Sequence, residues 1–208
     1  MGNPTFEILK VVATEAYHAD WKLVGDVAGK LSKAPGFLGA WQGLDVEDST
    51  YLWLIVAWES VEHHRALIDD KEQYPILLAS LHTVAKEIVF MHHAIFSGDF
   101  TKALGAPATE FAIWTLKEGV DRAEFQAGLA ELTQLIERDA AGEVFEGGWG
   151  AILEDERKFI VGLGWHSMER FKAAIAAAPE VRAKVGALRQ LAADVDLKLA
   201  SLSKYPGA

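Results

Sequence analysis

The chain repeats a pattern of aromatic, glycine and acidic residues after about half its length. Three positions recur with a spacing of 108 residues and three with a spacing of 107, namely Phe37/Phe145, Gly39/Gly147 and Trp41/Trp149, then Trp58/Trp165, Ser60/Ser167 and Glu62/Glu169. In a chain of 208 residues each copy would hold about 100, which is a common domain size. We therefore expect a first unit at 1–97, a linker at 98–109 and a second unit at 110–208.

Hydrophobic periodicity predicts the same element order, βαββαβ, in both units. In the first unit it predicts a strand at 6–12, a helix capped by Asp20 with Trp21 on its buried face, a hairpin at 37–44 and 50–58, a helix from Ser60 that is broken or bent at Pro75, and a strand at 88–96. In the second it predicts strands at 111–116, 143–153, 158–165 and 195–202, with helices between them.

A βαββαβ unit forms a four-stranded antiparallel sheet with both helices on one face. Both sets of alternating residues in the strand at 50–58 are apolar, so the other face must be covered too. The same face of the sister unit is the expected cover. The predicted fold class is α+β, with two ferredoxin-like units in tandem and their sheets packed face to face as an intramolecular barrel, a pseudo-dimer within one chain.

Short motifs then indicate a family. Trp58-Glu-Ser-Val-Glu62 closes a strand and opens a helix, Glu72-Gln-Tyr74 and His93-Ala-Ile-Phe96 follow, and Trp165-His-Ser-Met-Glu169 repeats the first motif. Over nearly its whole length the chain resembles the dimeric α+β barrel superfamily, most closely its antibiotic-biosynthesis-monooxygenase (ABM) domains. That superfamily includes cofactor-independent oxygenases of aromatic polyketides and quinols, haem-degrading enzymes, polyketide cyclases and proteins without an assigned activity. The resemblance implies a cofactor-independent monooxygenase of secondary metabolism, with a non-catalytic ligand-binding or stress-associated barrel protein as the alternative.

Departures from two branches narrow this range. The haem-degrading branch carries a second Trp and a His after the strand-ending Trp, and Leu67 and Leu77 stand at those positions here. The cyclase branch carries a Tyr and a His in the same helix, where this chain has Leu67 and Gln73. Neither haem degradation nor cyclisation is therefore expected.

Differences between the two copies suggest candidate catalytic residues. At the 107-residue spacing, His64 replaces Phe171 and His92 replaces Leu199, so both histidines should point between helix and sheet. A neutral imidazole buried there needs partners for both ring nitrogens. His93, on the other side of the strand, competes with His92 for this role. Core histidines bonded to a backbone carbonyl or a buried Tyr are the structural alternative.

The functional hypothesis is that His64 and either His92 or His93 converge in a pocket, where one is the general base for a phenolic or enolic substrate. The resemblance implies that the deprotonated ring then reacts with oxygen without a bound cofactor. The residues predicted to bind this small apolar or aromatic molecule are Tyr51, Trp53 and Phe90.

Composition excludes several other classes. A net charge of -10 without a run of Lys or Arg argues against nucleic acid and anionic membranes. The absence of Cys excludes disulfides and thiolate sites. Adjacent histidines do not chelate one ion, because His63 and His64 splay on a helix and His92 and His93 face opposite ways on a strand. A metal site would need one residue from each pair plus a carboxylate such as Glu59 or Glu62, so we predict no metal and no cofactor. Without an apolar leader, a cytoplasmic protein is expected, and further homo-oligomerisation stays open.

Overall fold

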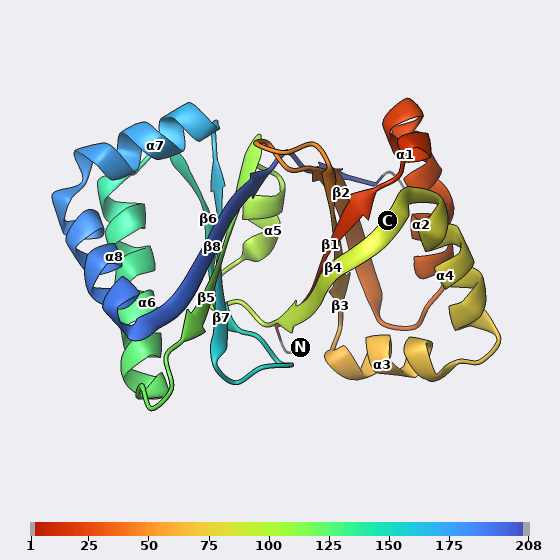
Figure 1. Cartoon of the computed structure of the whole chain (residues 1–208), viewed down its shortest axis with the longest axis horizontal. Coiled ribbons are helices and arrows are strands. Elements are labelled where there is room, and N and C mark those ends of the chain that lie inside the picture. Colours follow the sequence, from red (N-terminus) through yellow and green to blue (C-terminus); the bar gives the residue numbers. More distant parts are fainter. Residues whose placement is uncertain (1–2, 206–208) are drawn as a thin grey trace. The chain divides into compact units, whose positions relative to one another are not determined.

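The computed structural model describes residues 3–205, which form two compact units. Among these residues the first unit runs to Ala94 and also takes in the chain from Leu202 onward, and the second runs from Ile95 to Ser201. Each unit is an antiparallel sheet with its main helices on one face, and in the second unit the short helix α5 (Phe100–Leu104) lies on the opposite face (Figure 1). The predicted α+β class with two ferredoxin-like units in tandem is confirmed.

The first unit has the strand order β4-β1-β3-β2-β9. Its strands are β1 (Thr5–Ala13), β2 (Phe37–Leu44), β3 (Tyr51–Trp58), β4 (Ala85–Ala94) and the short β9 (Ser203–Lys204). Its helices are α1 (Glu15–Ala19), the 3₁₀ turn η1 (Trp21–Leu23), α2 (Val24–Leu31), α3 (Val61–Asp69) and α4 (Gln73–Val84). All neighbouring strands pair antiparallel, so β9 brings the end of the described chain back to the edge of the first sheet.

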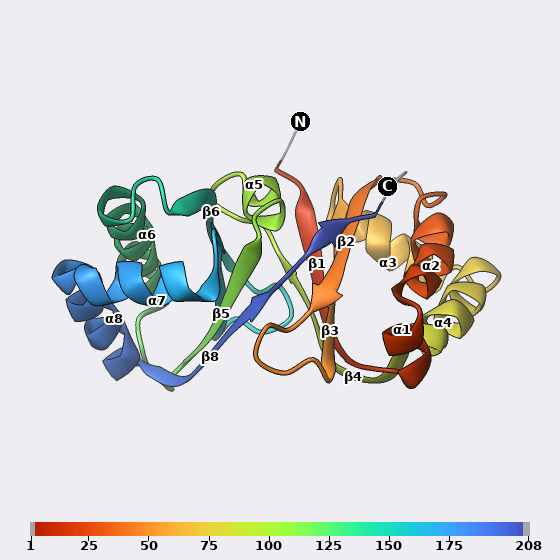
Figure 2. The ribbon, with the colours of Figure 1, turned by 90° about the horizontal axis from the view of Figure 1, so that it is seen from above.

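The helices of the first unit cover one face of its sheet (Figure 2). Alternate residues of the strands, such as Leu54 and Trp58, pack there against Leu31 of α2 and Leu81 of α4. Alternation along a strand sends the neighbouring residues to the opposite face. The sheet therefore presents two different surfaces, and only one of them meets the helices.

Two local predictions in this unit were correct only in part. Asp20 caps a helical turn, since its side chain accepts a hydrogen bond from the Lys22 backbone N–H. A separate helix, α1, precedes this turn, and Trp21 is 50% exposed instead of buried. The second helix is interrupted before Pro75, because Asp70 accepts hydrogen bonds from the backbone N–H groups of Glu72 and Gln73. Pro75 then lies in the first turn of α4, where a missing N–H is tolerated.

The second unit has the strand order β6-β7-β5-β8. Its strands are β5 (Ala108–Leu116), β6 (Val144–Ala151), β7 (Lys158–Trp165) and β8 (Ala192–Ala200), and its helices are α5 (Phe100–Leu104), α6 (Arg122–Asp139), α7 (Met168–Ala177) and α8 (Pro179–Leu191). No helix among residues 3–205 is long and apolar enough to cross a membrane.

The segment expected to be a linker carries structure of its own. It contains α5 and the start of β5, and Phe100 packs against Gly162 so closely that a side chain at this glycine would overlap its ring. Gly164 is covered in the same way by Ala106. Residues of the second unit itself therefore fill the volume that these two glycines leave on β7.

A β-bulge in β4 changes which residues of β4 and β8 correspond to each other. Ala85 and Ala192 occupy equivalent positions 107 residues apart, but Ala94 and Ala200 pair with equivalent residues only 106 apart. The extra residue is Val89, which the register skips. Beyond the bulge every residue changes its counterpart, because strand faces alternate with a period of two.

His93, not His92, is consequently the counterpart of Leu199. His93 pairs with Glu7 of β1 as Leu199 pairs with Glu110 of β5, and His92 corresponds to Lys198. The prediction that His92 replaces a core leucine was therefore wrong by one residue.

Candidate active site

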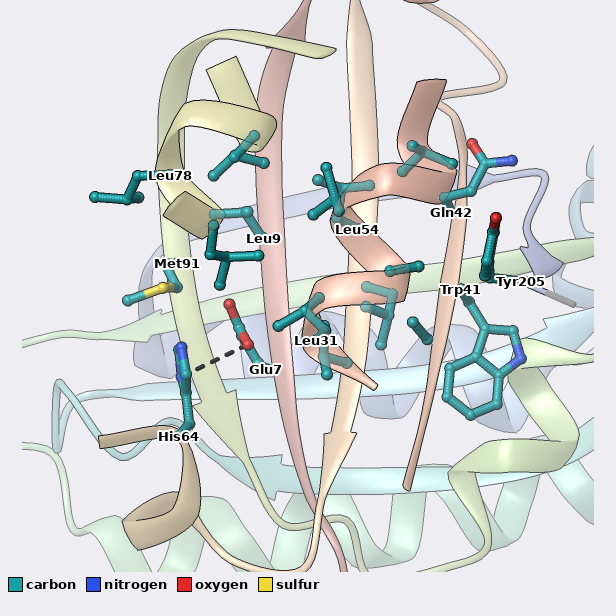
Figure 3. A pocket seen from close by; sticks show the side chains of 18 of the residues that line it. Glu7, Leu9, Leu31, Trp41, Gln42, Leu54, His64, Leu78, Met91 and Tyr205 are labelled. Atoms are coloured by element: carbon teal, nitrogen blue, oxygen red, sulfur yellow. Dashed lines mark ion pairs between the residues drawn. The ribbon is translucent and has the colours of Figure 1, made fainter. Parts of the chain in front are cut away.

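A cavity of about 70 Å³ lies between the sheet of the first unit and helices α2 and α4. Most of its wall is aliphatic, including Leu9, Leu31, Leu54 and Leu78 (Figure 3). The polar or ionisable side chains that reach it are those of Glu7, Gln42, His64, Tyr74 and Tyr205. An apolar cavity with a few convergent polar groups is the usual form of a small-molecule site.

Glu7 is a carboxylate in an otherwise apolar stretch of β1, and it is only 6% exposed. The indole Nε1 of Trp58 donates a hydrogen bond of 3.0 Å to its Oε2. Burial, and secondarily the charge of Glu7, raise the pKa of the nearby Tyr74 phenol. Since a buried carboxylate is costly unless it has hydrogen-bond partners, the position of Glu7 is held by specific contacts rather than by solvent.

His64 lies in the first turns of α3 and points at the same carboxylate. Its Nδ1 is 2.7 Å from Nε2 of His93 and 3.5 Å from Oε2 of Glu7. Its ring stacks on Trp58, with centroids 5.1 Å apart and planes 10° apart. Both histidines are almost fully buried, at 3% and 4% exposure. We call Glu7, His64 and His93 the Glu–His–His cluster.

This geometry suits proton transfer. A hydrogen bond of 2.7 Å joins Nδ1 of His64 and Nε2 of His93. One of these two nitrogens must therefore carry a hydrogen and donate it, and the other must accept it. A proton accepted by His64 from a molecule in the cavity would produce an imidazolium, and the Glu7 carboxylate would stabilise it, as the acidic residue of a catalytic triad does. Trp58 fixes both the His64 ring and the carboxylate. The cluster is thus oriented before any ligand arrives.

The same donor set could also hold a metal ion. The ligand atoms of the three residues all lie within 4.8 Å of one another. Two imidazoles and one carboxylate are a common set for divalent transition metals. The carboxylate comes from Glu7 of β1, and not from Glu59 or Glu62, the carboxylates that the sequence suggested.

The other predicted site residues lie elsewhere. His92 faces away from His93 and stacks on Phe90, with ring centroids 4.7 Å apart, and Phe90 meets Trp53 edge to face at 5.7 Å. Tyr51 and Trp53 share this face of the sheet. None of the four lines the cavity beside His64. The structure therefore brings together His64 and His93 and separates them from His92, Tyr51, Trp53 and Phe90.

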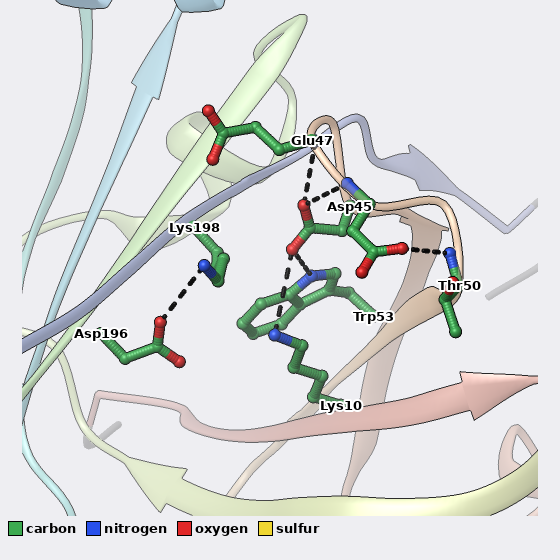
Figure 4. Close-up of polar contacts among 8 residues, drawn as sticks. Lys10, Asp45, Glu47, Thr50, Trp53, Asp196 and Lys198 are labelled. Carbon is green, nitrogen blue, oxygen red and sulfur yellow. Dashed lines mark hydrogen bonds and ion pairs between the residues drawn. The ribbon is translucent and has the colours of Figure 1, made fainter.

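A buried ion pair lies on that second face, next to Trp53 (Figure 4). Lys10 Nζ is 3.9 Å from Asp45 Oδ2, 4.3 Å from the ring centre of Tyr51 and 5.1 Å from that of Trp53. Trp53 Nε1 donates to Asp45 Oδ2 at 3.4 Å. These contacts give the two aromatic residues a structural partner, a cation–π contact with lysine. In the second unit Lys198 and Asp196 form a separate ion pair at 3.6 Å.

The hydrogen bond between the buried glutamate and the strand-ending tryptophan recurs in the second unit. Trp165 Nε1 donates to Glu110 Oε2 at 2.8 Å, but Phe171 and Leu199 stand where the first unit has its two histidines. Burial raises the pKa of Glu110 to about 7, and the hydrogen bond from Trp165 opposes this. The second unit thus keeps the carboxyl–indole pair and lacks the imidazoles.

Sequence reasoning missed Glu7 and the cavity residues Gln42, Tyr74 and Tyr205. A signal for Glu7 was present, because an acidic residue interrupts an apolar strand at the same place in both copies, as Glu7 and Glu110. Tyr205 lies far from the others in the chain, and only the pairing of β9 with β2 brings it to the cavity.

Comparisons with known proteins identify the fold. No family model matches the sequence, and no curated protein sequence matches it. Among solved structures, a provisionally assigned monooxygenase from Fusobacterium nucleatum is similar with a TM-score of 0.71 at 9% identity, covering 100% of this chain and 96% of that one. An anthrone oxidase-like protein gives 0.71 at 13% identity, covering 97% and 92%. A mutant chlorite dismutase from Candidatus Nitrospira defluvii gives 0.65 at 11%, covering 98% and 93%. The chain has the fold of the dimeric α+β barrel proteins.

Proposed function

We propose that the chain is a small-molecule enzyme of the monooxygenase type, which acts on an aromatic or polyketide-like substrate in the cavity of its first unit and uses no bound cofactor. The Glu–His–His cluster at the wall of an apolar cavity carries the proposal. The fold alone does not choose the reaction, since it occurs in proteins named as monooxygenase and anthrone oxidase-like and also in a chlorite dismutase.

His64 is the proposed general base. It lines the cavity, its Nδ1 contacts both His93 and Glu7, and its ring is clamped by Trp58. Removal of a proton from a phenol or enol leaves an electron-rich anion that can reduce oxygen directly. For anthrone the balance is simple: one oxygen atom of O₂ becomes the new carbonyl of anthraquinone and the other leaves as water. His93 and Glu7 are positioning residues that spread the positive charge.

The cavity sets a condition on the substrate. At about 70 Å³ it is smaller than a cavity of about 150 Å³ that holds benzene. A ring-bearing ligand must therefore displace side chains of the wall. Met91 and Leu78 lie at the wall, and both side chains can adopt other rotamers. Methionine is unbranched and adapts to irregular shapes with little loss of packing.

Oxygen uptake tests the proposal. With anthrone as the substrate, the expected result is consumption of one O₂ for each anthraquinone formed, with loss of activity in a folded His64→Phe variant. His63→Arg is the matched control, because His63 is a partly exposed neighbour on α3 whose counterpart is Arg170. Equal turnover in the wild type and His64→Phe would reject His64 as the base.

A chelator separates the base from a metal-dependent reaction. The proposal predicts that turnover is unchanged after prolonged treatment with EDTA. Loss of turnover on chelation, with recovery on adding a divalent metal ion, would assign the Glu–His–His cluster to metal binding instead. Tight binding of aromatic molecules without oxygen uptake would favour the alternative function, a non-catalytic ligand-binding protein.

A further inference from the structure

The cavity of the first unit has polar side chains at two separate places. Glu7 and His64 lie on one side, Gln42 and Tyr205 lie on the other, and the side chains of Leu9, Leu31 and Leu54 line the cavity between them (Figure 3). The mechanism proposed above uses only the first pair. The second pair contributes nothing to proton removal, yet it is built from segments more than 160 residues apart in the chain.

Gln42 is fixed by a hydrogen-bond network at this far side. The Tyr17 hydroxyl donates to its Oε1, and its Nε2 donates to the Ser203 hydroxyl at 3.2 Å. Burial raises the pKa of Tyr17 to about 12, so its phenol stays protonated and remains a donor at neutral pH. A primary amide carries two N–H hydrogens, and the bond to Ser203 uses one of them. The network thus orients an amide with further donor capacity at the cavity wall.

Tyr205 is placed by β9 and by a glycine on α2. Its backbone N–H donates to the Ala40 carbonyl at 2.9 Å, which continues the pairing of Ser203 and Lys204 with β2. Its hydroxyl lies directly against Gly25, where an added Cβ would overlap the hydroxyl oxygen. Gly25 is therefore required for the position of the Tyr205 ring, whereas a Cβ at Gly29 on the same helix would meet nothing within 4 Å.

We infer that Tyr205, beside Gln42, forms a second polar subsite, and that the substrate is an elongated aromatic molecule with oxygen substituents at both ends. The oxygen at one end would lie by His64, and a hydroxyl or carbonyl at the other end would bond to the Tyr205 phenol. This inference rests on the proposed function for the direction of the substrate but not for its binding. A ligand with only one polar group would leave the polar side chains at the other end of the cavity without a hydrogen-bond partner, which lowers its affinity.

Binding without turnover tests the inference. The probes are the naphthalenediol whose hydroxyls lie at opposite ends of the fused rings, and the naphthol that lacks one of these hydroxyls. Titration under nitrogen, followed by ligand fluorescence, should show that the full chain binds the diol about fivefold or more tightly than the naphthol, the size expected of one hydrogen bond. Equal affinities for the two probes, or no binding of the diol, would overturn the inference.

Three variants assign this difference to Tyr205. Tyr205→Phe should abolish the preference for the diol, and Gly25→Ala should do so too because the added methyl displaces the ring. Gly29→Ala, a matched change on α2, should keep the preference. If Tyr205→Phe retains it, or if the two alanine variants behave alike, the subsite is wrongly assigned. If the binding results are as expected but neither the wild type nor the variants consume oxygen, the proposed function is wrong and the assignment of the subsite still holds.

Discussion

Both units contain the same pair of a buried glutamate and a tryptophan, but different side chains surround this pair in the two units. In each, a glutamate in the first strand accepts a hydrogen bond from the tryptophan that ends the third, at 3.0 Å for Glu7 and 2.8 Å for Glu110. In the first unit two histidines surround this pair, and in the second Phe171 and Leu199 replace them. The carboxyl–indole pair therefore belongs to the shared fold, whereas the imidazoles are particular to one copy.

That contrast suggests which features are structural. In the second unit, burial raises the pKa of the Glu110 carboxyl to about 7, although Trp165 donates a hydrogen bond to it. Folding therefore favours the uncharged form of this group. The first unit adds two nitrogen bases and a cavity to the same frame. The second unit thus serves as an internal control for the first.

The largest expected effect comes from converting the first unit into the second. His64→Phe combined with His93→Leu should lower turnover of an aromatic substrate by about 10²–10⁴-fold, the usual contribution of a general base. Because the two rings act together, the double variant should lose little more than His64→Phe alone. Steady-state oxygen uptake measures both, with circular dichroism to show that each variant folds. Additive losses would mean that the histidines work independently.

The next effect concerns the pH dependence of stability in the second unit. The pKa of Glu110 is raised from 4.5 to about 7 by burial, so folding favours its protonated form. This contribution is fully present below pH 4.5 and is lost as the pH rises through 7. Ionisation should therefore lower the free energy of unfolding by about 3 kcal/mol at pH 8 relative to pH 4.5.

Glu110→Gln isolates this contribution. The variant removes the titration and keeps an acceptor for Trp165, so its stability should vary less between pH 4.5 and pH 8 than that of the wild type. Urea unfolding at the two pH values measures the difference. A variant whose pH dependence matches the wild type would show that Glu110 titrates normally in the folded protein.

A smaller effect separates the two tryptophans. Trp58→Phe and Trp165→Phe remove the same volume from equivalent buried positions, but Glu7 keeps His64 at 3.5 Å when its indole is lost. Leaving Glu110 without the indole donor should therefore destabilise the protein by about 1 kcal/mol more than the equivalent change in the first unit. The midpoints of thermal unfolding at pH 8 compare the two. A larger loss for Trp58→Phe would contradict this account.

The smallest effect is expected at the bulge. Val89 is an exposed extra residue in β4, and β8 forms the equivalent ladder without it. Deleting Val89 should keep His93 opposite Glu7 and change turnover by no more than about threefold, since the ladder beyond the bulge is unchanged. A folded deletion variant without activity would show that the bulge itself positions the site.

Much of the fold followed from the sequence because the repeat and the apolar periodicity are properties of the chain alone. The βαββαβ order and the correspondence of Trp58 with Trp165 needed no knowledge of distant contacts. The pairing of His64 with His93 could not be obtained in this way, because a one-residue bulge reverses the strand face and leaves no mark in the hydrophobic pattern. Tyr205 is set by an edge pairing between β9 and β2, which depends on tertiary structure.

The ligand site is assigned to the first unit, beside His64. A crystal structure of the full chain soaked anaerobically with the naphthalenediol tests it directly. We expect one ligand per chain, with one oxygen beside His64 and the other beside Tyr205. A ligand bound instead beside Glu110 and Phe171 in the second unit, or equally in both units, would contradict the account.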